Sequence, residues 1–150
     1  MADHYLPSPA GVYTYQALET PDSIRLLTLH PSPRDAPITC TLTHIPMDQS
    51  PPYRALSYEW GSQPDLSFAP LTINNLPFSR PIQANLSHAL VEIRSPNEDV
   101  TLWIDALCIN QCSPLEKSHQ VGLMSTIFRS ATSVIAWLGP EADNSSVAMS

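Results

Sequence analysis

The chain has 150 residues, 43% of them hydrophobic, which predicts one globular domain with a single core. Its 14 acidic residues outnumber 7 basic ones and give a formal net charge of -7, so it lacks the clustered basic surface that nucleic-acid binding requires. No apolar stretch approaches the about 20 residues of a membrane span, and no secretory signal opens the chain. We therefore expect a cytoplasmic protein without a membrane span.

The first half of the chain is rich in proline and predicts loops and short strands. Residues 1–22 have no sustained hydrophobic period and predict an irregular N-terminal arm. Three of its side chains are expected to pack back onto the domain: Tyr13, Tyr15 and Leu18. Residues 24–29 and 38–43 predict two strands that form an antiparallel hairpin at a sheet edge.

Short elements continue up to residue 93. Residues 53–58 predict a strand that leads into Glu59-Trp60-Gly61, and residues 71–78 predict a small hairpin with an asparagine turn. Asn85 is predicted to cap a helix that ends near Ile93, because apolar residues recur there at helical spacing.

Residues 101–139 form the strongest pattern, a strand, a helix and a second strand. The apolar run from Leu102 to Ile109 predicts a strand buried on both faces. Ser113, Pro114 and Glu116 have the spacing of a helix start in which serine caps the helix and glutamate reaches back to the cap amide. The pattern predicts a βαβ unit whose two strands lie side by side, parallel, with a right-handed crossover.

The last residues predict the start of another helix, over residues 141–149, with Asp143 or Asn144 as its cap. We therefore expect two regions: the arm at 1–22 and an α/β domain at 23–150 that is incomplete at its C-terminus.

Several separate blocks resemble the heterokaryon incompatibility (HET) domain of filamentous fungi. They are Tyr53-Arg54-Ala55-Leu56-Ser57-Tyr58-Glu59-Trp60-Gly61, Asn85-Leu86-Ser87-His88-Ala89-Leu90, Leu102-Trp103-Ile104-Asp105-Ala106-Leu107-Cys108-Ile109-Asn110-Gln111, the helix residues Glu116, Gln120-Val121, Met124, Ile127-Phe128 and Ala131, and Trp137-Leu138-Gly139. The resemblance implies a domain that triggers programmed cell death in fungal non-self recognition, by self-association or by binding a protein partner. It also implies a remote similarity to TIR domains, and hence a three-layer, flavodoxin-like and mostly parallel sheet.

The same resemblance leaves two alternatives open. Some TIR domains cleave NAD, so the chain is alternatively an NAD(P) glycohydrolase with NAD as its substrate; no other cofactor is implied. In TIR enzymes the catalytic glutamate follows a strand comparable to residues 134–138, a region that here holds Glu141. A third interpretation is an inactive, truncated remnant.

The chain departs from the family at Cys112-Ser113, where an acid usually follows the Asn-Gln pair, and the family leaves the position of Glu59 open.

The candidate catalytic residues are carboxylates at or near the carboxyl end of the sheet, where ligands of open α/β folds bind. Asp105 follows three apolar residues, so it needs either a functional role or local backbone amides that satisfy it. Glu116 acts either as a capping residue or as a general acid or base. Glu59 completes the set. Asn110 and Gln111 position either a ligand or a turn.

The remaining motif residues favour a binding or packing role. They are Ser57, Tyr58, Trp60, Gly61, Trp103 and Gln120. Trp60 either walls a pocket or fills the core, and Gly61 permits an unusual backbone angle.

The cysteines do not predict a metal site. Cys40, Cys108 and Cys112 are an odd number in a chain without an export signal, which indicates reduced thiols. Cys108 and Cys112 together with His119 lack a fourth ligand at zinc-site spacing, and the four glycines are too scattered for a phosphate-binding loop.

Overall fold

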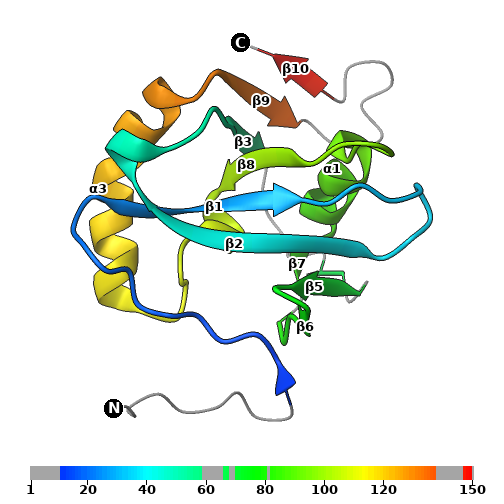
Figure 1. The fold of residues 1–150 in the computed structure, drawn as a ribbon, viewed down its shortest axis with the longest axis horizontal. Coiled ribbons are helices and arrows are strands. Elements are labelled where there is room, and N and C mark those ends of the chain that lie inside the picture. The colour runs from blue at the N-terminus through cyan, green and yellow to red at the C-terminus, as the bar shows by residue number, and fades with distance from the viewer. Residues whose placement is uncertain (1–10, 59–65, 68–69, 81, 138–146, 150) are drawn as a thin grey trace.

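A computed structural model describes residues 11–58, 66–67, 70–80, 82–137 and 147–149 of the chain. Most strands belong to one mixed sheet, shown in Figure 1. In spatial order its strands are β10 (Val147–Met149), β9 (Ser133–Trp137), β3 (Arg54–Tyr58), β8 (Val100–Ile104), β1 (Ser23–Leu29), β2 (Ile38–Pro46), β5 (Leu71–Ile73) and β6 (Leu76–Pro77). A separate two-stranded sheet pairs β4 (Leu66–Ser67) with β7 (Ile82–Gln83). The fold is therefore mixed α/β, as predicted.

The centre of the sheet is parallel. Strand β3 pairs in parallel with β8 on one side and with β9 on the other, so that Ala55 lies opposite both Trp103 and Val134. The strands of the predicted βαβ unit therefore run in the same direction in one sheet, but they are not neighbours, because β3 lies between them. The apolar run of β8 explains its central position, since Leu102, Trp103 and Ile104 are completely buried.

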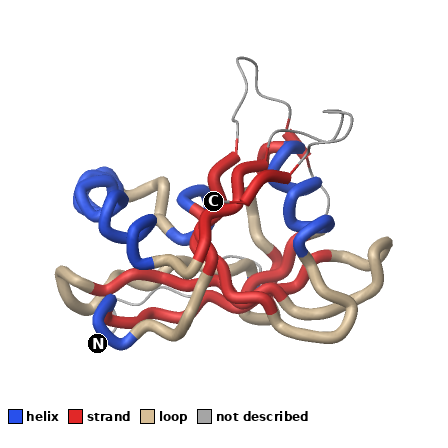
Figure 2. The backbone as a smooth tube through the Cα atoms, turned by 90° about the horizontal axis from the view of Figure 1, so that it is seen from above, coloured by secondary structure: helices blue, strands red, loops and turns tan. Residues whose placement is uncertain are grey.

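Among the described residues, three helices and one 3-10 turn accompany the sheet. They are α1 (Ala84–Ile93), α2 (Asp105–Cys108), α3 (Pro114–Ser130) and η3 (Met47–Gln49). Figures 1 and 2 show α1 and α3 on opposite sides of strands β9, β3 and β8. The parallel part of the sheet is thus covered by one helix on each face.

Antiparallel pairing is more frequent than predicted. Among the described strands of the large sheet, three neighbouring pairs are parallel and four are antiparallel, so a mostly parallel sheet is wrong. The hairpin of β1 and β2 forms with the expected antiparallel register, Leu27 opposite Leu42. It does not lie at the edge, because β1 also pairs with β8 and β2 with β5. Both hairpin strands are apolar enough to be buried within the sheet.

Several local boundaries differ from the prediction. The strand expected to reach Ile109 ends at Ile104, and the next residues turn into α2. Gln83, and not Asn85, occupies the N-cap position of α1, while Asn85 accepts a hydrogen bond of 2.7 Å from Trp137 Nε1. Val147–Met149 form strand β10 instead of a helix, antiparallel to β9. The expected caps Asp143 and Asn144 lie outside the described residues.

Other local signals are confirmed. Ser113 is the N-cap of α3, with its side chain accepting from Glu116 N at 3.2 Å and Pro114 in the first turn. The asparagine turn joins β5 and β6, and Asn74 and Asn75 have φ values of 53° and 67°. Asparagine tolerates this left-handed region better than other residues with a side chain, as a type I′ turn requires.

The segment from residue 11 to residue 22, which we call the N-terminal strap, runs along the domain without forming a helix or strand longer than one turn. Tyr13 N donates to Pro77 O at 2.9 Å, and the rings of Tyr13 and Tyr15 meet edge to face at 5.2 Å. Both tyrosines pack against the core, as predicted.

Candidate functional site

A buried arginine on β1 connects the N-terminal strap to the rest of the domain. Arg25 has no exposed surface. Its Nη2 donates to Gln16 O in the strap at 2.6 Å, its Nη1 donates to Cys108 O in α2 at 3.1 Å, and its guanidinium lies 4.9 Å from the centre of the Tyr15 ring. Because an unpaired buried charge is very unfavourable, the contacts of Arg25 with Gln16 and Tyr15 contribute to keeping the strap in place, and its contact with Cys108 ties β1 to α2.

Glu116 supplies the counter-charge of Arg25 from the first turn of α3. Its Oε1 accepts from Arg25 Nη2 at 2.9 Å and its Oε2 accepts from Arg25 Nη1, which makes the pair bidentate. The backbone amide of Asn110 also donates to Oε2, at 2.7 Å. Burial raises the pKa of Glu116, but the hydrogen bonds from Arg25 and Asn110 outweigh it and hold the pKa below its usual value. Glu116 is thus an ionised anchor.

The predicted capping box is therefore only half formed. Ser113 caps the helix, but the Glu116 carboxylate reaches the amide of Asn110 and not that of Ser113. Arg25 lies 91 residues away in the sequence, and its attraction explains why the carboxylate turns away from its own helix start.

His44 on β2 completes the polar cluster around Arg25. Arg25 Nε donates to His44 Nε2 at 3.3 Å, so this ring nitrogen carries no proton. Burial and the neighbouring guanidinium both lower the pKa of His44, against the opposite pull of Glu19 and Glu116. A neutral imidazole is the form that fits beside a buried arginine.

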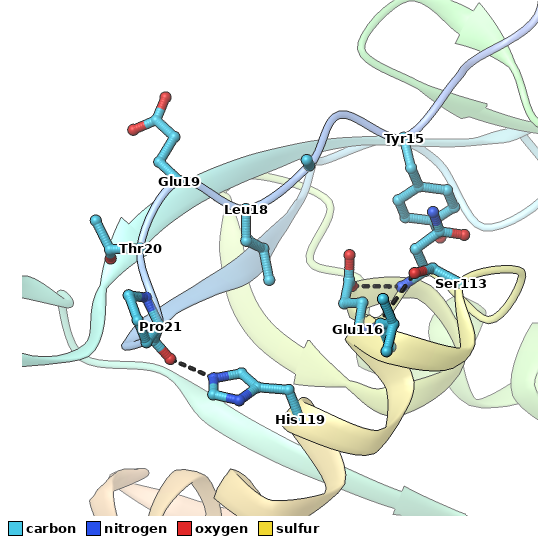
Figure 3. Close-up of a pocket in the computed structure, with 11 residues that line it drawn as sticks. Tyr15, Leu18, Glu19, Thr20, Pro21, Ser113, Glu116 and His119 are labelled. Carbon is cyan, nitrogen blue, oxygen red and sulfur yellow. Dashed lines mark hydrogen bonds between the residues drawn. The ribbon is translucent and has the colours of Figure 1, made fainter.

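A groove of about 620 Å³ lies between the strap and α3 (Figure 3). Its lining residues are Tyr15, Ala17, Leu18, Glu19, Thr20, Pro21, Asn110, Ser113, Leu115, Glu116 and His119. His119 Nε2 makes a hydrogen bond of 2.5 Å with Pro21 O and closes the end of the groove nearest β1. This volume falls within the range of ligand and peptide pockets in general.

Asp105 lies elsewhere, at the carboxyl end of β8, where it begins α2. Burial raises the pKa of its half-buried carboxyl group, while hydrogen bonds from its own amide and that of Ala106 and the charge of Lys117 act in the opposite direction. Asp105 does not line the groove. Backbone amides thus lie close to the Asp105 carboxyl group, as expected if the carboxyl group is satisfied locally and has no functional role.

The charge of Asp105 acts on the motif residue Tyr58. It ends β3, and burial together with the charge of Asp105 raises the pKa of its hydroxyl. Tyr58 is the last residue of β3 and Asp105 directly follows the parallel strand β8, so both lie at the carboxyl edge at which open α/β sheets bind ligands. Ser57, next to Tyr58, is exposed on the same strand.

The amide pair after α2 makes local hydrogen bonds. Asn110 Oδ1 accepts from Cys112 N at 3.1 Å, and Gln111 Nε2 donates to Asp105 O at 2.8 Å. Both contacts shape the turn between α2 and α3. Asn110 in addition lines the groove, so part of this turn forms one side of the groove.

The remaining motif residues are divided between the core and the part of the chain outside the described residues. Trp103 is completely buried, and its ring meets Phe128 edge to face at 5.6 Å. Gln120 is also completely buried and donates from Nε2 to Ser23 O at 3.1 Å, which ties α3 to β1. Glu59, Trp60 and Gly61 lie outside the described residues, as does Glu141.

The three cysteines are free thiols. Cys40 and Cys108 are buried and Cys112 is exposed. Burial raises the pKa of Cys108 to about 12, so it remains a protonated, unreactive thiol. Within the described residues, no group of three or more His, Cys, Asp or Glu side chains converges as in a metal site, and no helix is long and apolar enough to cross a bilayer.

Sequence reasoning missed Arg25, the residue with the most contacts in the site. The available signal was its position in Ile24-Arg25-Leu26-Leu27, where a single charge interrupts an apolar strand. A buried arginine must have a partner, but nothing in the local sequence identifies Glu116 as that partner.

Comparison with known proteins decides the family. Residues 53–150 match the family described as heterokaryon incompatibility protein (HET). The chain belongs to the HET family. The match begins at the strand β3 and includes α1, β8, α2, α3 and β9, so it contains every motif block described above.

A relative extends the similarity toward the N-terminus. The chain is 36% identical to "Heterokaryon incompatibility protein 6, OR allele" of Neurospora crassa over an alignment 155 positions long. The alignment covers 95% of this HET chain and therefore reaches upstream of residue 53, but it covers 23% of the relative. The chain thus spans about a quarter of the length of that protein. No solved structure matches the chain.

Proposed function

We propose that this chain is a cytoplasmic HET signalling module that triggers programmed cell death in fungal non-self recognition, through a protein partner or self-association. The observation that carries the proposal is the 36% identity to a heterokaryon incompatibility protein over 95% of the chain. The family match over residues 53–150 supports it independently.

The described carboxylates also favour binding over chemistry. Glu116 accepts hydrogen bonds from three donors of Arg25 and Asn110, so most of the acceptor capacity of its carboxylate is used within the domain. Asp105 has backbone amides within hydrogen-bonding distance and lies outside the groove. A module that works by contact with another protein does not require either group to exchange a proton.

A segment exchange tests the proposal. In Neurospora crassa, the part of the incompatibility protein that aligns with this chain is replaced by the chain, and cell death is scored by dye uptake after fusion with an incompatible strain. We expect the exchanged protein to restore cell death, and a protein with the segment deleted to remain inactive. An exchanged protein that accumulates normally and causes no cell death above the deletion would contradict the proposal.

One observation favours an enzyme as the second candidate. Tyr58 ends β3 and Asp105 directly follows the adjacent parallel strand β8. Because β3 lies between β8 and β9 and α1 and α3 cover opposite faces there, this edge has the arrangement of a topological switch point. A carboxylate at such a point could stabilise an oxocarbenium-like ribosyl transition state during NAD hydrolysis. The test is release of nicotinamide from NAD by the purified chain, with Asp105→Asn as the comparison. If both proteins release nicotinamide equally, or if neither releases any, Asp105 does not take part in NAD hydrolysis.

A further inference from the structure

Helix α3 keeps two large apolar side chains exposed in addition to the face that packs on the core. Of its 17 residues, only Gln120 and Ile127 are buried. Ile127 and the partly buried Leu123, Met124 and Phe128 form the apolar stripe by which α3 packs on the core. Here Leu115 is 86% exposed and Val121 is 52% exposed, and these are two of the three large exposed hydrophobic residues in the described part of the chain. Apolar surface is therefore available on the outer side of α3.

Leu115 borders the groove described above, in which several apolar side chains meet. Figure 3 shows Leu18 directed from the strap into the space over α3. The Tyr15 ring forms one end of the lining and Pro21 forms the opposite end. The groove thus has apolar lining residues on both of its sides, the strap and α3. The contacts of Arg25 and His119 hold these two sides together.

The charges around the groove indicate which kind of partner segment it binds. Glu19 and Glu116 line it, and none of the described residues that line it is lysine or arginine. Arg25 already balances Glu116, but Glu19 lies at the rim with its carboxylate turned outward in Figure 3. The whole chain carries a formal charge of -7, so two copies would repel one another. A basic partner suits this surface better than a second copy.

We propose that the groove between the strap and α3 binds a segment of another protein that presents an apolar side chain next to a lysine or arginine. The apolar side chain packs between Leu18 and Leu115, and the cation faces Glu19. This inference rests on the proposed function, since it gives the signalling module a partner of defined chemistry.

Selection from a peptide library tests the inference with the full chain. Phage-displayed random peptides of about 12 residues, long enough to span a typical recognition groove, are selected on the immobilised protein. The enriched sequence is synthesised, and its affinity is measured by fluorescence anisotropy for the unchanged chain and for three variants. Leu115→Glu removes the apolar contact and Glu19→Lys reverses the rim charge. Val121→Glu is the matched control, because it lies on the same helix but about 120° around the axis from Leu115.

We expect the enriched peptides to share an apolar residue beside lysine or arginine. Affinity should fall roughly tenfold or more in Leu115→Glu, as at an interface hot spot. It should also fall in Glu19→Lys and with added salt, and it should be unchanged in Val121→Glu. All three positions are exposed, so the variants should remain folded, and thermal melting is the measurement that checks this.

Three outcomes would overturn the inference: no enriched sequence, an acidic enriched sequence, or binding that survives Leu115→Glu. A concentration-dependent dimer that Leu115→Glu abolishes would assign the groove to a second copy and also overturn it. The segment exchange in Neurospora crassa separates this inference from the proposed function. Cell death without any peptide binding would reject the groove alone, whereas peptide binding without cell death would reject the function alone.

Discussion

Replacement of Glu116 by alanine should lower the free energy of unfolding far more than the loss of an exposed ion pair does. The Glu116 side chain is 12% exposed and Arg25 is completely buried, so the substitution leaves a buried guanidinium without its counter-charge. Removal of one partner of a buried pair costs about 3–5 kcal/mol. Arg25 keeps its bonds to Gln16 O and Cys108 O, which places the expected loss near the lower end of that range, about 3 kcal/mol.

Two variants calibrate this prediction. Glu116→Gln keeps the volume and one acceptor but loses the charge, so a smaller loss of about 1.5–3 kcal/mol is expected, as for hydrogen bonds to charged groups. Glu92→Ala breaks the exposed pair of Glu92 with Arg34, whose side chains are 39% and 71% exposed, and the loss should be below about 1 kcal/mol. The measurement is the free energy of unfolding in urea, followed by circular dichroism.

Acid provides an independent readout of the same pair. The folded-state pKa of Glu116 is depressed below its ordinary value of 4.5, so its stabilisation is fully present above pH 4.5 and is lost as the pH falls through the folded-state pKa. Glu116→Gln should flatten this part of the stability profile. The reasoning would be refuted if Glu116→Ala destabilised the chain no more than Glu92→Ala does, or if Glu116→Gln left the acid profile unchanged.

Three further predictions concern single local features. Ser113→Ala removes the side-chain cap of α3 and should lower the free energy of unfolding in urea by about 1 kcal/mol, whereas Ser113→Asp, which can also cap, should not. Cys112 should react with a thiol reagent at once in the folded protein, while Cys40 and Cys108 should react only on unfolding, because both are buried; three thiols of equal reactivity would contradict this. Trp103→Ala should cost about 3–5 kcal/mol in the same urea measurement, and Trp103→Phe clearly less, because the indole fills the core against Phe128.

Local sequence signals predicted the elements whose cause is local. The spacing of Ser113, Pro114 and Glu116 placed the start of α3, and the Asn74-Asn75 pair placed the β5–β6 turn. In both cases the residue type itself determines the backbone conformation or supplies the cap. Such features do not depend on which distant segment packs against them.

Features that depend on distant partners could not be predicted. A continuous apolar run fits a buried strand and a buried helical turn equally well. The run through residues 105–108 therefore predicts a strand, although these residues form α2. The insertion of β3 between β8 and β9 follows from pairing across the sheet, which hydrophobic period does not encode. The contact of Arg25 with Glu116 is of the same kind, because each residue alone has an ordinary local explanation.

Strand β1 has a practical consequence for any shortened form of this protein. The family match begins at residue 53, but β1 and β2 precede it and continue the sheet beyond β8 through Leu27 and Leu102. A protein trimmed to the family boundary would expose the backbone of β8 as a bare edge, ready to pair with other molecules. It would also lose Arg25 and leave the Glu116 carboxylate without a cation. Aggregation of such a fragment would then reflect where it was cut, and would say nothing about the stability of the intact domain.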